Sequence, residues 1–473
     1  MQVKISPFLK EQKKMFENVI DELSKEFKYV SILGADSKGM SYGVRSTGAS
    51  VEDSMWSERG FVLRVFNGVN YSEYSFNEID EKDILKQIRK IAKDDIKSFK
   101  DKGISINEYP LIEEEGIIDS FFGEVEILPK DRTAEQKVLK LTEIMNKGLE
   151  KFDKLIDFRV RYEEVQVSKI FISTKKNLEQ SYIYSTGALI PIAANEEGVK
   201  YSFKSYSGLK GFELLKEMET GIDEAVKEVE ELLTAQKVEP GTYDIICDPD
   251  MSGLIAHEAF GHGVELDMFV KNRAKAAEFV NKPVASEITQ MHDGARSAEE
   301  VSSYLFDDEG TIGTDTVIID KGILKSGISD VLSAMKLGLK PTGNGKRESF
   351  ERKAYSRMTN TFFKPGNDKL EDMIKSIAKG YILEGFQSGM EDPKNWGIQC
   401  VAMKGREIID GKITGKIVSP VYLTGYVPDL LKSISMVSDD LVLSGGGACG
   451  KGHKEWVKTS TGGPYIKAVG RLG

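Results

Sequence analysis

Two of the four histidines in this 473-residue chain flank a glutamate, in the segment HEAFGH that begins at His257. Because histidine is so scarce here, the grouping of His257, Glu258 and His262 points to a function. Neutral imidazole is a good zinc ligand, and a nearby carboxylate can take a proton from a metal-bound water. The segment therefore predicts a catalytic zinc site in which the two histidines bind the metal and Glu258 is the base.

The five-residue spacing of the two histidines does not suit a regular α-helix if both are to bind one metal ion. Residues four apart lie about 40° from each other around an α-helix, whereas residues five apart lie about 140° from each other. A regular helix therefore cannot easily direct both rings at one ion. Gly261 would allow the helix to widen or end, so we predict a local irregularity such as a π-bulge over Ala259 to His262. Asp248 or Asp250 is expected to cap this helix.

A catalytic zinc needs a third protein ligand and an open position for water. Cys449, in the glycine-rich segment SGGGACGKGHKEW, is the best candidate, because thiolates bind zinc and glycines allow a close backbone approach. Glu265 is the alternative, since carboxylates also complete such sites. His453 could instead join Cys449 and close the site into a structural one. The other cysteines, Cys247 and Cys400, are expected to be small buried side chains.

The same glycine-rich segment raises a competing hypothesis, nucleotide binding. Gly445 to Lys451 matches the first part of the phosphate-binding pattern GxxxxGK. The next residue is Gly452, however, where magnesium binding would require serine or threonine. The remainder of the chain contains Gly462, Gly463 and Pro464 rather than a clear helical pattern, so this hypothesis is the weaker one.

The elements that must position these residues fall into two halves. A Pro-Gly turn marks a boundary near residues 236–241, and glycine and short strand patterns are more frequent after it. The sequence predicts an α+β fold, with a helix and antiparallel-meander domain at 1–235 and a β-rich domain at 236–473 that carries the HExxxH helix. Residues 266–310 have weak periodicity and are predicted to form a mobile loop or lid. Helical periodicity in the first half covers residues 9–27, 83–100, 134–152 and 212–233, and strand patterns cover 28–76 and 158–208.

Composition and charge exclude several classes of protein. The net charge is −10 and the acidic residues are spread along the chain, which argues against nucleic acid as a partner. No stretch approaches the roughly 18 apolar residues of a membrane helix, and the N-terminal residues lack the apolar core of a secretory signal. Three cysteines provide no disulfide framework and suit a reducing compartment, so we expect a cytoplasmic protein.

Five segments together resemble the TldD/PmbA family of metallopeptidases, on the metal-bearing TldD side. The first half of the chain also resembles the N-terminal domain of that family, so the resemblance spans most of the sequence. The sequence departs from the family in two places. The family segment that corresponds to FQSGMEDPKNW, at residues 386–396, is richer in glycine, and the family often has glycine or glutamine-type residues near the position of His453. The five segments are HEAFGHGVE, TGNGKRESF at 342–350, SRMTNTFF at 356–363, GACGKG at 447–452 and TGGPYI at 461–466.

The resemblance implies a zinc-dependent peptidase with His257, His262 and Cys449 as ligands and Glu258 as the base. It also implies a homodimer, or a heterodimer with a related subunit lacking the metal motif, that encloses a chamber for unfolded or flexible peptides. The substrate backbone would lie along a sheet edge. The enzyme would then recognise the main chain of the substrate more than its side chains. A metal-stabilised peptide-binding or scaffold protein without turnover is the alternative.

Three further polar residues are candidates for contact with substrate or with an oxyanion. Arg357 and Asn360 lie in the polar segment SRMTN, and His453 follows the CGK segment. Their side chains are hydrogen-bond donors of the kind that stabilise a developing negative charge. Roles in turns, or on the surface for His453, are the competing interpretations.

Overall fold

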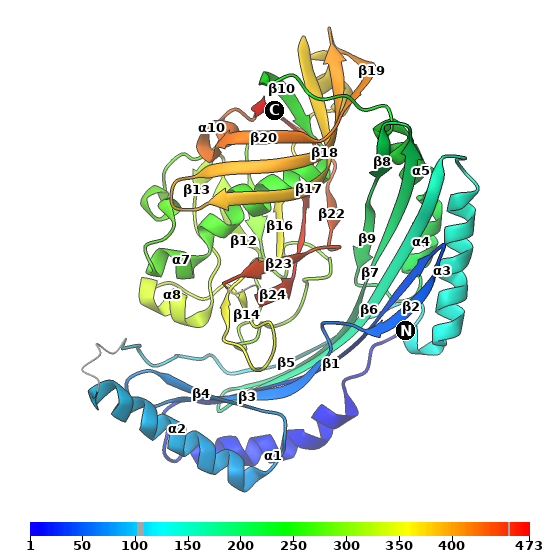
Figure 1. Cartoon of the computed structure of the whole chain (residues 1–473). Helices are drawn as coiled ribbons and strands as arrows, with labels where there is room; N and C mark the ends of the chain where they lie inside the picture. Colours follow the sequence, from blue (N-terminus) through cyan, green and yellow to red (C-terminus); the bar gives the residue numbers. More distant parts are fainter. Residues whose placement is uncertain (102–107, 453–454) are drawn as a thin grey trace.

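The computed structural model describes residues 1–101, 108–452 and 455–473. A curved nine-stranded sheet forms most of the first half (Figure 1). Its main path runs β4-β3-β1-β6-β7-β5, while β2 pairs with β1, and β8 and β9 pair with β7. The strands are β1 (Val30–Arg45), β2 (Gly48–Asp53), β3 (Glu58–Phe66), β4 (Tyr71–Phe76), β5 (Ile117–Phe122), β6 (Leu155–Ser173), β7 (Lys176–Asn195), β8 (Gly198–Tyr201) and β9 (Lys204–Gly208).

The two strand patterns of the first half join in this single sheet rather than forming separate meanders. Strand β1 pairs antiparallel with β6 along most of its length, from Ser31 opposite Ser173 to Val44 opposite Val160. Side chains alternate between the two faces of a strand. On β6, Phe158, Val160 and Tyr162 therefore pack among the helices, whereas Val165 and Val167 face the C-terminal half.

Helices cover the outer face of this sheet, and α1, α2 and α3 follow its curve (Figure 1). The sequence predicts one helix over 212–233, but the chain forms two, which meet at Gly221. A side chain at Gly221 would lie 1.7 Å from the hydroxyl of Tyr206, so glycine is required at this close contact. The helices are α1 (Pro7–Leu23), α2 (Glu81–Asp101), α3 (Ala134–Leu149), α4 (Leu214–Thr220) and α5 (Ile222–Leu232).

The second half contains two further sheets with a helix between them. The seven-stranded sheet contains β10 (Gly241–Cys247), β17 (Lys379–Asp392), β18 (Gly397–Ile409), β19 (Lys412–Val418), β20 (Val421–Tyr426), β21 (Met436–Val437) and β26 (Ile466–Leu472). The six-stranded sheet contains β11 (Met291–Asp293), β12 (Thr316–Asp320), β13 (Ile323–Leu324), β16 (Asn360–Phe363), β22 (Val442–Ser444) and β25 (Ser460–Gly463). Helix α6 (Pro249–Leu254) contacts β17 of one sheet and β25 of the other.

Short elements complete this half, and two of them are hairpins that matter for the site. One hairpin pairs β14 (Gly345–Lys346) with β15 (Tyr355–Ser356), and the other pairs β23 (Ala448–Lys451) with β24 (Glu455–Lys458). The mixture of helices and sheets confirms the predicted α+β class. The short helices are α7 (Leu266–Val270), α8 (Val331–Leu337), α9 (Leu370–Lys375) and α10 (Val427–Lys432).

The predicted loop or lid at 266–310 is packed into the molecule. It contributes α7 and β11, and its later part contacts the inner face of the first sheet. Val301 and Tyr304 are buried there against Val165 and Tyr184. Weak periodicity in this segment therefore reflects irregular packing between two surfaces. Among the described helices, none has both the length and the apolar character needed to cross a membrane.

Candidate metal centre

The helix that carries the two histidines changes its geometry along its length. Helix α6 begins after Asp248, whose carboxylate accepts a hydrogen bond of 2.8 Å from the backbone of Met251 and caps the helix. The chain then forms a π-helix over Ile255–Gly261 and a 3₁₀ turn over His262–Val264. The predicted helical irregularity is confirmed, although it begins at Ile255 rather than Ala259.

The π-helix brings the histidines to one side. Its hydrogen bonds link residues five apart, so residues at this spacing become neighbours along the helix. The rings of His257 and His262 accordingly lie 5.2 Å apart between centres, at 90° to each other. Gly261 is needed here, because a side chain would lie 2.3 Å from the sulfur of Met358.

Cys449, on β23, completes a compact group of three ligand types. One donor atom from each of His257, His262 and Cys449 lies within 4.8 Å of the others. The Cys449 Sγ is 3.6 Å from Nε2 of His262. Nitrogen and sulfur ligands on a tetrahedral zinc are roughly 3.5 Å apart, given bonds of about 2.1 and 2.3 Å. The buried Nδ1 of His257 has no hydrogen-bond partner among the described residues, so the donor set fits a metal ion.

The charges in this group also suit a metal. Burial opposes ionisation of Cys449, yet the adjacent His257 and His262 hold the pKa of its thiol well below its usual range. Burial likewise opposes protonation of His262, but Glu265 and Cys449 raise the pKa of its ring well above its usual value. A thiolate is the form of cysteine that binds metals. The site therefore favours the ionised thiol before any ion arrives.

Glu265 lies behind His262 rather than within the ligand group. Its Oε2 is 3.3 Å from Nδ1 of His262, on the side of the ring away from Cys449. Lys451 contacts the same carboxylate at 2.8 Å, and burial is outweighed by this charge, so the pKa of Glu265 falls to about 2. A carboxylate in this position fixes the orientation of a metal-binding imidazole. Glu265, which the sequence offered as an alternative ligand, thus contacts and supports His262.

Glu258 lies beside the ligands and is partly exposed to solvent. Its two carboxylate oxygens are each 4.0 Å from an Nε2 atom, one of His257 and the other of His262. Its side chain is 24% exposed, so water can reach it. Gly389 on β17 makes room for it, because a side chain there would lie 2.7 Å from Cγ of Glu258. If a metal ion bound to the three donors, this arrangement would allow Glu258 to contact a water on that ion.

The structure places Arg357 and Asn360 in buried contacts. Arg357 donates hydrogen bonds to the backbone oxygens of Cys449, at 2.6 Å, and Glu455, at 3.0 Å, and so holds the β23–β24 hairpin. Asn360 donates to the backbone oxygen of Gly294 at 3.0 Å and is itself fully buried. His453, the third candidate, lies outside the described residues. As predicted, Cys247 and Cys400 are buried free thiols.

Strand β17 contributes a feature that the sequence analysis missed. It pairs with β10 only from Gly380 to Leu383, and among the described strands its continuation to Asp392 pairs only with β18. Beside Gly389 on the same face is Glu391, whose two carboxylate oxygens are buried without hydrogen-bond partners among the described residues. The residues of this edge lie in FQSGMEDPKNW, the segment that departs from the family pattern, and no motif marked them.

Comparison with known proteins decides the family. Residues 240–470 match the PmbA/TldA metallopeptidase C-terminal domain. A metalloprotease of Methanothermobacter thermautotrophicus is 31% identical over 320 residues, which cover 67% of this chain and 69% of the relative. The chain belongs to the TldD/PmbA family of metallopeptidases. It is therefore a peptide-bond hydrolase, as its sequence motifs predicted.

Two further proteins extend the comparison for this TldD/PmbA metallopeptidase. A zinc metalloprotease TldD homolog of Saccharolobus solfataricus is 32% identical over 228 residues, covering 48% of this chain and 50% of the relative. The crystal structure of TldE from Thermococcus kodakarensis superposes with a TM-score of 0.75 and 20% identity, covering 97% of this chain and 99% of that one. The likeness to TldE shows a shared fold.

The nucleotide-binding hypothesis for this metallopeptidase is wrong. The GGGACGK segment leads into the β23–β24 hairpin, and the described residues after it form strands β24, β25 and β26. A phosphate-binding loop requires a helix at this position, because the helix N-terminus helps to hold the phosphates. The ammonium of Lys451 is instead occupied by Glu265 and by Asp267, at 2.8 and 2.7 Å.

Proposed function

We propose that this metallopeptidase binds zinc through His257, His262 and Cys449 and hydrolyses peptide bonds with Glu258 as the catalytic base. The observation that carries the proposal is the convergence of the three donor atoms within 4.8 Å, with the Glu258 carboxylate 4.0 Å from both imidazoles. Three protein ligands leave a tetrahedral position for water. Zinc bound there would lower the pKa of that water and polarise the carbonyl of the substrate.

The residues of the chain have separate tasks in this mechanism. Glu258 accepts a proton from the attacking water and passes it to the leaving amine. Glu265 accepts a hydrogen bond from Nδ1 of His262, which directs Nε2 of that ring toward the metal position. Arg357 holds the backbone of Cys449 and so fixes the thiolate relative to the helix. Glu265 and Arg357 would thus hold the donor atoms in place without binding the metal themselves.

We infer that the substrate is an unfolded or flexible peptide that adds a strand to the sheet at β17. Beyond Leu383 this strand has an edge that pairs with no described strand, and its Gly389 touches Glu258. An added strand would form backbone hydrogen bonds with that edge and pass beside the base. Only extended peptides can bind in this way, because the backbone of a folded protein is already hydrogen-bonded.

We further propose that the enzyme works as a dimer that encloses the site in a chamber. The partner would be a second copy or a related subunit without the metal motif, and the likeness in fold to TldE supports the second choice. The three free cysteines suit the reducing cytoplasm, where the Cys449 thiolate would remain available to the metal.

The decisive experiment compares Glu258→Gln with His257→Ala in the zinc-loaded protein. Glu258→Gln should retain zinc by elemental analysis and reduce cleavage of an unstructured fluorogenic peptide by roughly 10²- to 10⁴-fold. His257→Ala should lose both zinc and activity. The control is Glu278→Gln, because Glu278 is exposed on the surface. Cleavage by Glu258→Gln at the parental rate would refute the mechanism, and a zinc-loaded parent that binds peptide without cleaving it would favour the scaffold alternative.

A further inference from the structure

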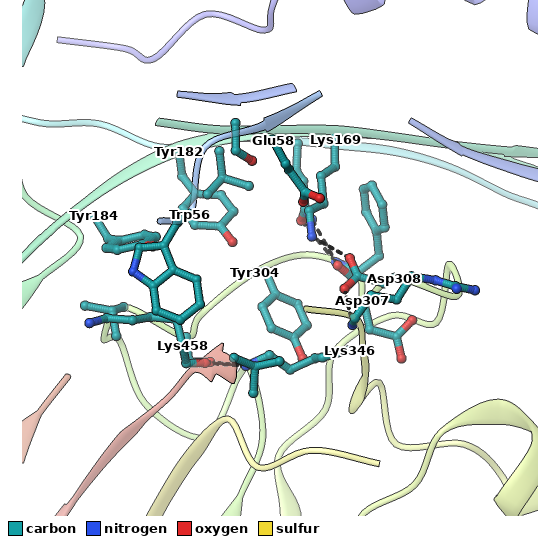
Figure 2. A pocket seen from close by; sticks show the side chains of 18 of the residues that line it. Trp56, Glu58, Lys169, Tyr182, Tyr184, Tyr304, Asp307, Asp308, Lys346 and Lys458 are labelled. Atoms are coloured by element: carbon teal, nitrogen blue, oxygen red, sulfur yellow. Dashed lines mark hydrogen bonds and ion pairs between the residues drawn. The ribbon is translucent and has the colours of Figure 1, made fainter. Parts of the chain in front are cut away.

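A cavity lies between the inner face of the nine-stranded sheet and the loops of the C-terminal half (Figure 2). The space that water-sized atoms can occupy within it is about 90 Å³, enough for several water molecules or one small organic group. Tyr182 and Tyr184 on β7 and Lys169 on β6 line it from the sheet, and Tyr304 and Lys458 line it from the opposite side.

Strand β24 of the β23–β24 hairpin borders the cavity. Within this hairpin Cys449 is directly opposite Val457, and Ala448 is directly opposite Lys458. Directly opposed residues share a face of a β-ribbon, and the next residues along each strand point to the other face. The side chain of Lys458 therefore leaves the hairpin on the face opposite to the Cys449 thiol. The cavity thus borders the hairpin that carries the proposed metal ligand, with Lys458 and Val457 both in its lining.

One end of the cavity contains charged groups that already have partners. Lys169 forms an ion pair of 2.5 Å with Asp308. The carboxylate of Glu58 accepts a hydrogen bond of 3.0 Å from the backbone of Phe350 and lies next to Lys169 (Figure 2). Lys346 donates to the hydroxyl of Ser302 and to two backbone oxygens. These groups neutralise or satisfy one another without a ligand.

Lys458, at the other end, has no such partner. Its ammonium lies 5.9 Å from the ring centres of both Trp56 and Tyr184 (Figure 2). Within the described part of the chain, its ammonium forms no ion pair or hydrogen bond, although Glu163 and Glu300 lie near enough to affect its titration. Burial lowers its pKa to about 8, so it is charged at neutral pH. A partly desolvated charge without a partner is unfavourable, and an anion would relieve it.

We propose that this cavity binds a carboxylate with an apolar or aromatic body, with the carboxylate on the Lys458 ammonium and the body against Trp56 and Tyr184. A single ammonium between two rings matches one negative charge and a flat apolar group. A phosphate carries more charge and usually takes arginine or several donors. Glu58 and Asp308 at the far end, and Glu163 and Glu300 near Lys458, also disfavour any negative charge beyond a single one. The proposal does not depend on the peptidase mechanism.

Calorimetry on the zinc-loaded, full-length protein tests this with N-acetyl-phenylalanine and its neutral amide. A hydrogen bond to a charged group contributes about 1.5–3 kcal/mol, so the acid should bind roughly 10- to 100-fold more tightly than the amide. Lys458→Met should abolish this preference, and Lys458→Arg should retain it. Lys412→Met, a change of an exposed lysine on β19, should leave the preference unchanged. Melting temperatures establish that each variant is folded.

Two further titrations distinguish binding in the cavity from binding at the metal, and a peptide C-terminus from other aryl acids. Because a carboxylate can also bind a metal, the titration is repeated in His257→Ala, in which the preference for the acid should persist. A comparison with 3-phenylpropionate identifies the source of the carboxylate. Tighter binding of N-acetyl-phenylalanine indicates a peptide C-terminus, and equal binding indicates aryl acids in general. The proposal is overturned if acid and amide bind equally, if neither binds at millimolar concentration, or if Lys458→Met retains the preference.

Discussion

The nine-stranded sheet and the metal centre differ in how regularly their residues are arranged. Strands β6 and β7 contain 19 and 20 residues, and their side chains alternate between the helix layer and the C-terminal half. At the metal centre the chain passes from α-helix to π-helix to 3₁₀ turn between Pro249 and Val264. Several neighbouring strands have only two to four residues, among them β14, β16 and β23.

Both regions bury polar groups, but in different settings. The core between the first sheet and α3 contains apolar side chains such as Leu141, Ile144 and Phe158 together with the buried ion pair of Lys137 and Glu164. Near the metal centre, the fully buried Asp293 accepts hydrogen bonds from Asn344 and Thr359. Such networks specify one arrangement when every member has a partner. The regular half supports the molecule, and the irregular half places single side chains for chemistry.

The largest effect on activity is expected from Gly389→Val on β17. This variant tests the difference between the metal centre and the nine-stranded sheet. The new side chain would lie 2.7 Å from Cγ of Glu258 and 2.9 Å from Leu254, so the carboxylate must move. Misplacing a catalytic group by about 1 Å can reduce the rate roughly 10²-fold. We expect a fall of this size in kcat with zinc content retained, measured by steady-state kinetics and elemental analysis.

The matched control for that change is Gly397→Val on β18, where a side chain meets no atom within 4 Å. Its activity should equal that of the parent. Parental activity in Gly389→Val as well would show that the close approach of β17 to Glu258 has no role in catalysis.

An intermediate effect is expected from Leu141→Ala, in the regular half. Leu141 is fully buried between α3 and the sheet. Truncation of a buried leucine costs about 2–5 kcal/mol through lost burial and the cavity that remains. The melting temperature should fall while kcat at 25 °C stays near the parental value. Leu139→Ala, at a position 57% exposed on the same helix, should change neither. A loss of zinc in Leu141→Ala would break the distinction between the two regions.

The smallest effect is expected from Glu228→Gln, on α5. Burial raises the pKa of this carboxyl to about 7, above its usual value of 4.5. Above pH 7 the folded protein therefore contains an ionised group that burial disfavours, whereas below pH 4.5 the group is protonated in both folded and unfolded states. The variant should melt higher than the parent at pH 8 and equally at pH 4, by calorimetry. Glu230→Gln, which is exposed, provides the control. A stabilisation of the same size at pH 4 would exclude ionisation as the cause.

Local patterns predicted most helices and strands of the first half, since α3 begins at the expected residue and α2 differs from its expected bounds by two residues or fewer. Their periodicity depends on neighbours a few residues away. Strand β5 was not predicted, and α1 ends four residues before its expected end. The break at Gly221 escaped this reasoning, because it arises from contact with Tyr206 on another element. The burial of 266–310 escaped it for the same reason, since that segment packs against the distant sheet.

The amino-acid sequence alone determined which donors are available and that a regular helix could not bring His257 and His262 to one ion. The need for a π-helix followed from the five-residue spacing, which is a local property. Only the tertiary structure decided that Cys449, 187 residues from His262, lies at the site and that Glu265 lies behind it. Contacts between distant segments depend on how whole sheets pack, and no short-range pattern records that packing.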